Sequence, residues 1–286
     1  MRTVLAIYTL CAVAMVVVSF ATGGRSGHRT VNVVGSTSIQ PFAEMLSEEY
    51  RHRRPGAKVE VQGGGSTAGL QACAEGIADI GTCSRGLKED EARRFRGITI
   101  ALDGLAVVVH RSNPVSGLSG AQIRDIFSGA ISNWSEVGGN DQPIRLITRE
   151  EGSGTREAFV KLVMQAKGPA GGVSAPPANG QKEPARISRR ALTQESNGAV
   201  KELVRHDPAA IGYMSLGLVG GDLNILTVDG VHPSTGAVAA GRYPLVRPFL
   251  FVVKGQPGAE AQAFIDFVLS PSGQQVLEKE GLVRAP

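Results

Sequence analysis

Three patterns that would indicate other functions are missing from this 286-residue chain. The 30 lysines and arginines exceed the 26 acidic residues only slightly, and no basic block with interleaved aromatic residues occurs, so we expect no nucleic-acid partner. The five histidines show no metal-ligand spacing, and we expect neither a bound metal nor another cofactor. A Gly-x4-Gly-Lys-Ser/Thr phosphate loop is also missing, which argues against nucleotide hydrolysis.

Cysteine is scarce as well, with three residues in the whole chain. Cys73 lies near the end of a predicted helix, and Cys83 at the far end of the next predicted strand. If these elements run antiparallel, the two cysteines lie about 8 Å apart along the axis, and the spacing between packed layers adds to this. A disulfide needs Cα atoms within roughly 7 Å, so we expect two buried free thiols.

The N-terminus carries an apolar run over residues 4–21. It follows Arg2 and ends in Ser19-Phe20-Ala21, a small-x-small cleavage pattern, so residues 1–28 are predicted to be a secretory signal peptide. The run also reaches the lower length limit of a spanning helix, which leaves an uncleaved N-terminal anchor as the alternative. Cys11 lies inside the run rather than at its end, so we expect no lipid attachment. The mature protein is predicted to be periplasmic or otherwise extracytoplasmic.

From residue 31 onward, strand-like and helix-like segments alternate, which predicts an α/β architecture with mostly parallel sheets. The length allows about two domains. Apolar strands near residues 105–109 and 249–253 are the predicted crossovers between two lobes, with residues 29–108 and 246–286 in lobe 1 and residues 109–245 in lobe 2. Residues 167–184 contain four prolines and four glycines and are typical of a surface loop. Trp134 is expected to anchor its own loop by packing.

The stretch Thr148–Arg156 reads Thr-Arg-Glu-Glu-Gly-Ser-Gly-Thr-Arg between a predicted strand and a predicted helix. Glycine lets the backbone approach a ligand closely, and the first helical turn offers free N–H groups and partial positive charge. Arg149 adds a planar, fork-shaped donor set suited to a tetrahedral oxyanion. The stretch therefore indicates an anion site, and the alternative is an ordinary turn capped by Ser153.

Two further hydroxyl-rich turns, at residues 35–41 and 63–69, also lie between a predicted strand and a predicted helix. Because three such turns occur in one chain, we favour the interpretation that they bind one small anion together over the interpretation that they are three unrelated helix caps. Ser84 and Arg85 follow another strand, and ligands of open α/β sheets gather at strand carboxyl ends. A simple strand-end turn is the alternative for these two residues.

The chain resembles the phosphate-binding protein of the Pst-type ABC transporter through four motifs that occur in the family's order. The motifs are Gly-Ser-Thr-Ser-Ile-Gln-Pro at 35–41, Gly-Gly-Gly-Ser-Thr-Ala-Gly at 63–69, Asp-Ile-Gly-Thr-Cys-Ser-Arg at 79–85 and Arg-Glu-Glu-Gly-Ser-Gly-Thr-Arg at 149–156. The resemblance implies a type II-like, two-lobed periplasmic-binding-protein fold that delivers inorganic phosphate to the membrane permease of an ABC transporter. We expect this protein to be a monomer.

The resemblance carries phosphate contacts onto residues of the first turn, the second turn and the central stretch. Together with the residue-based candidates, the predicted phosphate site comprises Ser36, Thr37, Ser38, Ser66, Ser84, Arg85, Asp103, Arg149, Ser153, Gly154 and Thr155.

The chain departs from the family pattern at one position. Some family members have an aspartate where this chain has Ser84, and that carboxylate accepts the proton of hydrogen phosphate while repelling sulfate. Asp103 interrupts an apolar strand, where an unpaired carboxylate is costly, so it must be paired, at an edge or facing a polar cleft. We take Asp103 as the candidate replacement, with a hinge or capping carboxylate as the alternative.

Two functions other than transport are alternatives for this sequence. A serine-dependent hydrolase needs a nucleophile motif, but neither Ser66 nor Ser153 completes Gly-x-Ser-x-Gly, so we expect no catalysis. An exported phosphate sensor would use the same site without a permease, and nothing in the sequence distinguishes it from a transport protein.

Overall fold

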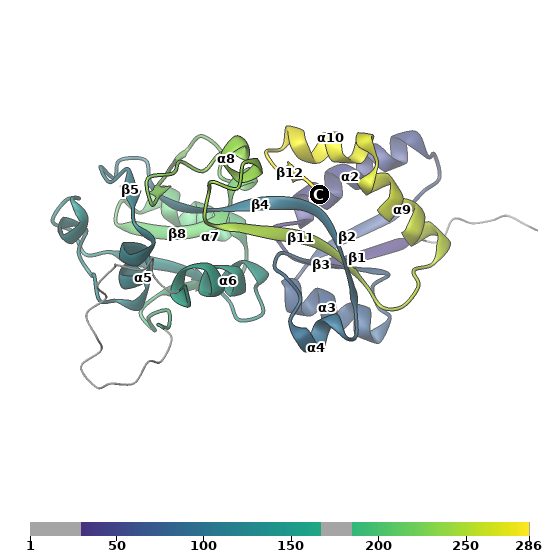
Figure 1. The fold of residues 1–286 in the computed structure, drawn as a ribbon, viewed down its shortest axis with the longest axis horizontal. Coiled ribbons are helices and arrows are strands. Elements are labelled where there is room, and N and C mark those ends of the chain that lie inside the picture. Colours follow the sequence, from purple (N-terminus) through teal and green to yellow (C-terminus); the bar gives the residue numbers. More distant parts are fainter. Residues whose placement is uncertain (1–29, 167–184, 286) are drawn as a thin grey trace, which may run out of the picture.

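Two long strands, β4 (Arg96–His110) and β11 (Val246–Val253), run between two α/β lobes (Figure 1). The structure is a computed structural model that describes residues 30–166 and 185–285. The predicted signal peptide with Cys11 and the predicted loop at residues 167–184 lie outside the described residues. Within the described residues, no helix is both long and apolar enough to cross a membrane.

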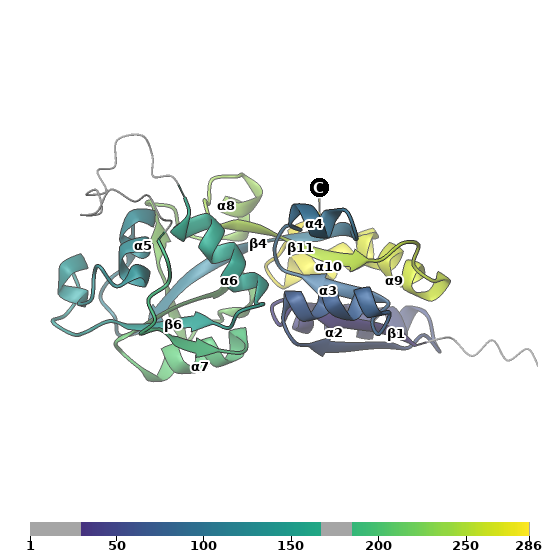
Figure 2. The same cartoon turned by 90° about the horizontal axis from the view of Figure 1, so that it is seen from below.

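Lobe 1 is a sheet with helices on both faces (Figures 1 and 2). Its elements are β1 (Val31–Gly35), α2 (Gln40–Arg53), β2 (Val59–Gly63), α3 (Ser66–Glu75), β3 (Ile80–Cys83), α4 (Glu89–Ala92), α9 (Ala259–Leu269), α10 (Pro271–Lys279) and β12 (Val283–Arg284). One core joins α2, α9 and α10 to the sheet, and a smaller core joins α3 to the other face.

Lobe 2 has the same three-layer plan. Its elements are β5 (Gly117–Leu118), α5 (Gly120–Ser128), η1 (Trp134–Val137), β6 (Arg145–Arg149), α6 (Gly154–Phe159), η2 (Val160–Met164), β7 (Leu192–Gln194), α7 (Asn197–His206), β8 (Ala210–Ser215), η3 (Leu216–Leu218), β9 (Leu223–Ile225), β10 (Thr227–Val228) and α8 (Thr235–Ala239). Helices α5 and α6 pack on one face of the sheet and α7 on the other.

Strand β4 belongs to the sheets of both lobes because it changes its neighbours along its length. Residues 96–104 pair with β11, and Leu105–Val109 pair with β8. The strand order is β2-β1-β3-β11-β4-β8-β6-β7. The prediction of two α/β lobes joined by crossover strands is therefore confirmed, and the change of partner falls directly after Asp103 and Gly104.

The prediction of mostly parallel sheets holds only toward the outer strands. Strand β1 is parallel to β2 and β3, and β6 is parallel to β7 and β8. In the centre of the sheet the pairs are antiparallel: β11 with β3 and with β4, and β4 with β8. The reason is the connection between lobes, since β4 leaves lobe 1 and β11 returns to it beside β4 in the opposite direction.

Three local predictions concern buried side chains. Trp134 is 1% exposed and its indole Nε1 donates to the main-chain oxygen of Ala209 at 2.9 Å, which confirms the packing role. Cys73 and Cys83 are free, buried thiols, as predicted. Burial raises the pKa of the Cys73 thiol to about 11, as expected for a thiol in apolar surroundings.

Candidate anion-binding site

Polar turns from the two lobes meet directly where their strands end. In lobe 1 they follow β1 and β2, and in lobe 2 the turn follows β6. Arg149 Nη2 donates to Thr37 Oγ1 at 3.1 Å, and the main-chain N–H of Thr67 donates to the oxygen of Gly152 at 3.1 Å. These contacts join segments more than 80 residues apart, and the lobes are closed on each other. The structure therefore brings together the three turns that the sequence singled out.

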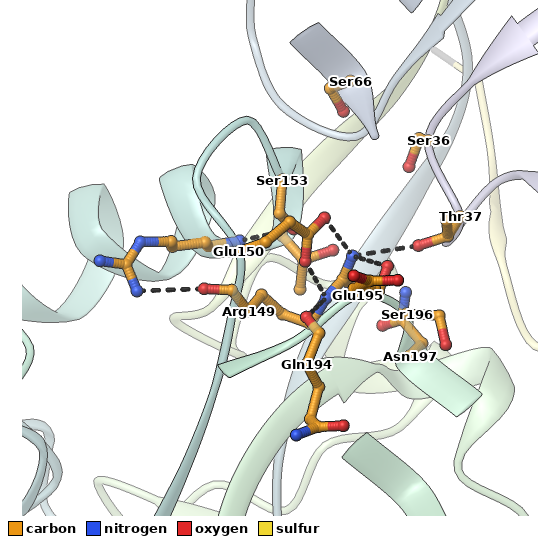
Figure 3. A network of polar contacts seen from close by, with 12 residues as sticks. Ser36, Thr37, Ser66, Arg149, Glu150, Ser153, Gln194, Glu195, Ser196 and Asn197 are labelled. Carbon is orange, nitrogen blue, oxygen red and sulfur yellow. Dashed lines mark hydrogen bonds and ion pairs between the residues drawn. The ribbon is translucent and has the colours of Figure 1, made fainter. Parts of the chain in front are cut away.

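Arg149, the last residue of β6, is 1% exposed and lies at the centre of this contact (Figure 3). Its Nε and Nη2 atoms each donate to one carboxylate oxygen of Glu150 at 2.9 Å. They also donate to the main-chain oxygens of Gln194 and Glu195, both at 3.1 Å. Nη1 is buried and has no hydrogen-bond partner among the described residues. A buried donor without an acceptor is costly, so Nη1 is positioned to bind an acceptor from solution.

The turn after Arg149 presents the start of α6. Ser153 caps this helix, since its Oγ accepts from the main-chain N–H of Arg156 at 3.3 Å. The N–H groups of Gly154 and Thr155 precede any intrahelical acceptor, so they are available to an anion. A Cβ at position 154 would collide with the Ser66 hydroxyl and lie 2.7 Å from Ser84 Oγ, which explains why glycine is required there.

Lobe 1 supplies hydroxyl groups that face the α6 turn of lobe 2. The hydroxyl of Ser36 accepts from the N–H of Ser38 at 3.2 Å, and Ser38 Oγ lies 2.8 Å from Thr155 Oγ1. Ser66 begins α3, and its Oγ accepts from the N–H of Ser84 at 3.1 Å. All of these residues except Thr155 come from lobe 1, and each is at most 2% exposed.

Two residues of this cluster, Arg247 and Asn197, were not predicted. Arg247 in β11 is 2% exposed and donates to Thr155 Oγ1 at 2.8 Å and to Ser38 Oγ at 3.2 Å. Asn197, the first residue of α7, donates from Nδ2 to Ser38 Oγ at 2.9 Å. Arg247 had a detectable signal, because it is an isolated charge in an otherwise apolar strand, as Asp103 is.

Asp103 does not fit the predicted role of a carboxylate that faces the anion. It lies opposite Arg247 in the β4–β11 ladder, and its Oδ2 accepts from Arg247 Nε at 2.9 Å. Its Oδ1 accepts from the Ser215 hydroxyl at 2.9 Å. Burial raises the pKa of Asp103, and the charge of Arg247 opposes this effect. Both carboxylate oxygens already have partners, so the hinge alternative describes Asp103 better.

Arg85 is also directed elsewhere. Its guanidinium donates to both carboxylate oxygens of Glu91, at 2.6 and 2.8 Å. Its Nε lies 3.0 Å from a carboxylate oxygen of Glu157 on α6. Two glutamates pair with Arg85, which links the two lobes in this structure, and its contact with the anion stays a prediction.

The assembled site consists mainly of hydrogen-bond donors. The positive charges of Arg149 and Arg247 are each paired with one carboxylate, so the site carries little net charge before a ligand enters. Hydroxyl groups, helix N-termini and the spare Nη1 of Arg149 surround the same region. Such an arrangement binds a small, dehydrated oxyanion. In the described part of the chain, no cluster of three or more His, Cys, Asp or Glu residues could hold a metal ion.

The two-lobed fold with an anion site at the strand ends defines the class of two-lobed anion-binding proteins. Comparison with known proteins agrees with this class. The model of the PBP superfamily domain matches residues 21–272. Phosphate-binding protein PstS of Bacillus subtilis is 30% identical over 259 residues, which cover 89% of this chain and 80% of that protein. The chain belongs to the Pst-type phosphate-binding proteins within the PBP superfamily. The family and fold predicted from the sequence are thereby confirmed.

Solved structures give the same result. A phosphate ABC transporter substrate-binding protein from Clostridium perfringens, solved with bound phosphate, superposes with a TM-score of 0.81 at 35% identity. The similarity covers 90% of this chain and 100% of that chain. An ABC-type phosphate transport receptor from Vibrio cholerae superposes with a TM-score of 0.71, also at 35% identity, over 89% of this chain and 100% of that one.

Proposed function

We propose that this protein captures inorganic phosphate between its lobes and delivers it to the permease subunits of an ABC transporter for import. The observation that carries the proposal is Arg149 Nη1, a buried donor group without a hydrogen-bond acceptor among the described residues, in a guanidinium whose Nη2 donates to Thr37 of the other lobe. The names and bound phosphate of the relatives support the choice of phosphate among tetrahedral oxyanions.

Of the predicted residues, we propose that Ser36, Thr37, Ser38, Ser66, Ser84, Arg149, Ser153, Gly154 and Thr155 form the phosphate site. We also propose lobe 1 as residues 29–108 and 246–286 and lobe 2 as residues 109–245, with the hinge where β4 changes partners. The protein would act outside the cytoplasm as a monomer, after export by its N-terminal segment.

We further propose that the protein is a receptor and not an enzyme. The hydroxyl of Ser153 is used as a helix cap, and that of Ser66 accepts from a main-chain N–H. On the surface, His110 Nδ1 is hydrogen-bonded to the Ser112 hydroxyl, and His206 Nδ1 is hydrogen-bonded to the main-chain oxygen of Glu202. These contacts give neither serine an imidazole base, which supports binding without turnover.

Calorimetric titration of the purified protein with phosphate tests the proposal, with sulfate as the competitor. We expect one phosphate per chain, because the two lobes form one site. We also expect sulfate to compete measurably, because Ser84 stands in place of a carboxylate and Asp103 is already paired. Binding of neither anion would refute the proposed function.

A further inference from the structure

Six buried residues form a closed ring of hydrogen bonds, five between side chains and one through the main-chain N–H of Ser215, around the hinge and the proposed phosphate site. In order around the ring they are Asp103, Ser215, Asn197, Ser38, Thr155 and Arg247. Each is at most 2% exposed. The ring contains one residue of the lobe 1 turns, three residues of lobe 2 and the paired residues of both crossover strands.

Arg247 and Arg149 differ in the use of their donor groups. All three side-chain nitrogens of Arg247 have protein partners, since Nε bonds to Asp103 and Nη2 lies 2.9 Å from the same carboxylate. Nη1 donates to Thr155 Oγ1 and to the main-chain oxygen of Ser84, at 2.8 and 3.4 Å. Arg149 keeps a spare nitrogen, as described above. Arg149 is therefore suited to contact an anion directly, and Arg247 can act on the anion only through its neighbours.

The first neighbour is Ser38, whose hydroxyl oxygen receives two hydrogen bonds. One donor is Arg247 Nη2 at 3.2 Å and the other is Asn197 Nδ2 at 2.9 Å. The orientation of the Asn197 amide is determined by its oxygen, which accepts from the main-chain N–H of Ser215 at 3.2 Å. A hydroxyl oxygen has two acceptor positions, and both are filled. The hydrogen of Ser38 must therefore be donated, and Thr155 Oγ1 lies 2.8 Å away to accept it.

The second neighbour is Thr155, to which the same argument applies. Its oxygen accepts from Ser38 at 2.8 Å and from Arg247 Nη1 at 2.8 Å. Both acceptor positions are then filled, and the hydroxyl hydrogen of Thr155 remains to be donated. Thr155 stands in the α6 turn beside the free N–H groups, so the acceptor that this hydrogen can reach is a bound anion.

We infer that Arg247 is a positioning residue. Together with Asn197 it directs the Ser38 hydroxyl toward Thr155, which makes the Thr155 hydroxyl an obligatory donor to phosphate. This inference rests on the proposed function and adds a source of specificity to it. A site that offers only hydrogen-bond donors can bind the unprotonated oxygens of an anion. It cannot accept a hydrogen bond from a protonated ligand oxygen. The site should therefore favour the dianion of phosphate over the monoanion.

The ring also links this ordering to lobe closure. The Ser38–Thr155 and Ser38–Asn197 bonds join lobe 1 to lobe 2. Opening the lobes would break both bonds and free the hydroxyl groups to rotate. Only the closed form then presents the ordered Thr155 hydroxyl to the anion, so binding of phosphate to this donor favours closure.

The test removes the Arg247–Asp103 pair by the double substitution Arg247→Gln and Asp103→Asn. Changing both residues avoids an unpaired buried charge and keeps the net charge of the site, so long-range attraction for the anion is unchanged. The matched control is Arg145→Gln with Asp207→Asn, which removes an Arg–Asp pair on the surface of lobe 2. Circular dichroism and thermal unfolding establish that each variant is folded.

Calorimetry with inorganic phosphate should show at least about tenfold weaker binding for the Arg247/Asp103 variant and unchanged binding for the control. In a Thr155→Val background, removal of the same pair should lower the phosphate affinity only about twofold, because Arg247 acts through the Thr155 hydroxyl. Wild-type affinity should rise with pH across the second ionisation of phosphate, and the rise should flatten when the pair is removed.

Three results would overturn the inference. Unchanged affinity of the Arg247/Asp103 variant would show that the ordering has no effect. An equal loss with and without the Thr155 hydroxyl, or an unaltered pH profile, would show that Arg247 acts by another route. Absence of phosphate binding by the wild-type protein would instead refute the proposed function and, with it, this inference.

Discussion

Replacement of Arg149 by alanine should weaken phosphate binding by orders of magnitude while leaving the fold intact. Nη1 carries two N–H groups, and it has no hydrogen-bond partner in the part of the chain that the structure describes. Each charge-assisted bond to an anion contributes about 1.5–3 kcal/mol, so two such bonds amount to about 3–6 kcal/mol. This corresponds to a loss of affinity of roughly two to four orders of magnitude.

Calorimetric titration with phosphate measures this loss, and two further variants separate its causes. Arg149→Lys keeps the positive charge but lacks the planar fork, so we expect an intermediate affinity. Arg145→Ala removes the arginine at the other end of the same strand, which is paired with Asp207 on the surface. This control should bind phosphate as tightly as the wild type.

A folded Arg149→Ala variant with wild-type affinity would show that the anion does not bind at Nη1, and the site would have to be placed elsewhere. Equal losses in the Arg149 and Arg145 variants would point to damage to strand β6 rather than to a lost contact. Thermal unfolding with and without phosphate distinguishes these cases, because a bound ligand raises the melting temperature.

Three further predictions follow from contacts outside the anion site. Burial raises the pKa of Cys73 to about 11, so its thiol should react with a thiol reagent at pH 8 only after unfolding, which a colorimetric thiol assay measures. Burial favours protonated Glu91, but the hydrogen bonds from Arg85 and the N–H of Lys88 outweigh it and hold the pKa below 4.5. This stabilisation is present above the pKa of Glu91 in the unfolded chain, and it is lost as the pH falls through the pKa in the folded protein. The melting temperature of the Glu91→Gln variant should therefore drop less than that of the wild type on acidification below about pH 4.5. An equal drop in both proteins would contradict this prediction. A carboxylate oxygen of Glu157 lies 2.7 Å from Lys88 Nζ and 3.0 Å from Arg85 Nε, which joins lobe 2 to lobe 1. Glu157→Gln should therefore favour the open form and weaken phosphate binding about twofold to fivefold, as measured by calorimetry. Tighter binding by this variant would refute the role of Glu157 in lobe closure.

The parts of the site that the sequence predicted are those built by neighbouring residues. The stretch from Arg149 to Thr155 contains its own strand end, glycine turn and helix cap, and the structure forms all three. The same holds for the two turns of lobe 1, where Gly65 adopts a φ of 93° at the start of α3. Short-range sterics and capping determine such features, so they can be read from a few consecutive residues.

The roles of Asp103 and Arg85 could not be read in this way. The sequence restricted Asp103 to a paired, edge or cleft position, but its partner Arg247 lies 144 residues further along the chain. The guanidinium of Arg85 could bind an anion, but in the folded protein it is paired with the carboxylates of Glu91 and Glu157. Which acid meets which base depends on how the elements pack.

The sequence by itself therefore determined the α/β lobes and the polar turns, because periodicity, glycine and helix capping act over a few residues. The family followed from the resemblance of its four motifs. Only the tertiary structure decided which donors remain free. Arg247 reaches Ser38 across 209 residues of chain, and Asn197 reaches it across 159. The hydrogens of Ser38 and Thr155 are ordered by these distant partners, since a hydroxyl donates or accepts according to the groups that surround it.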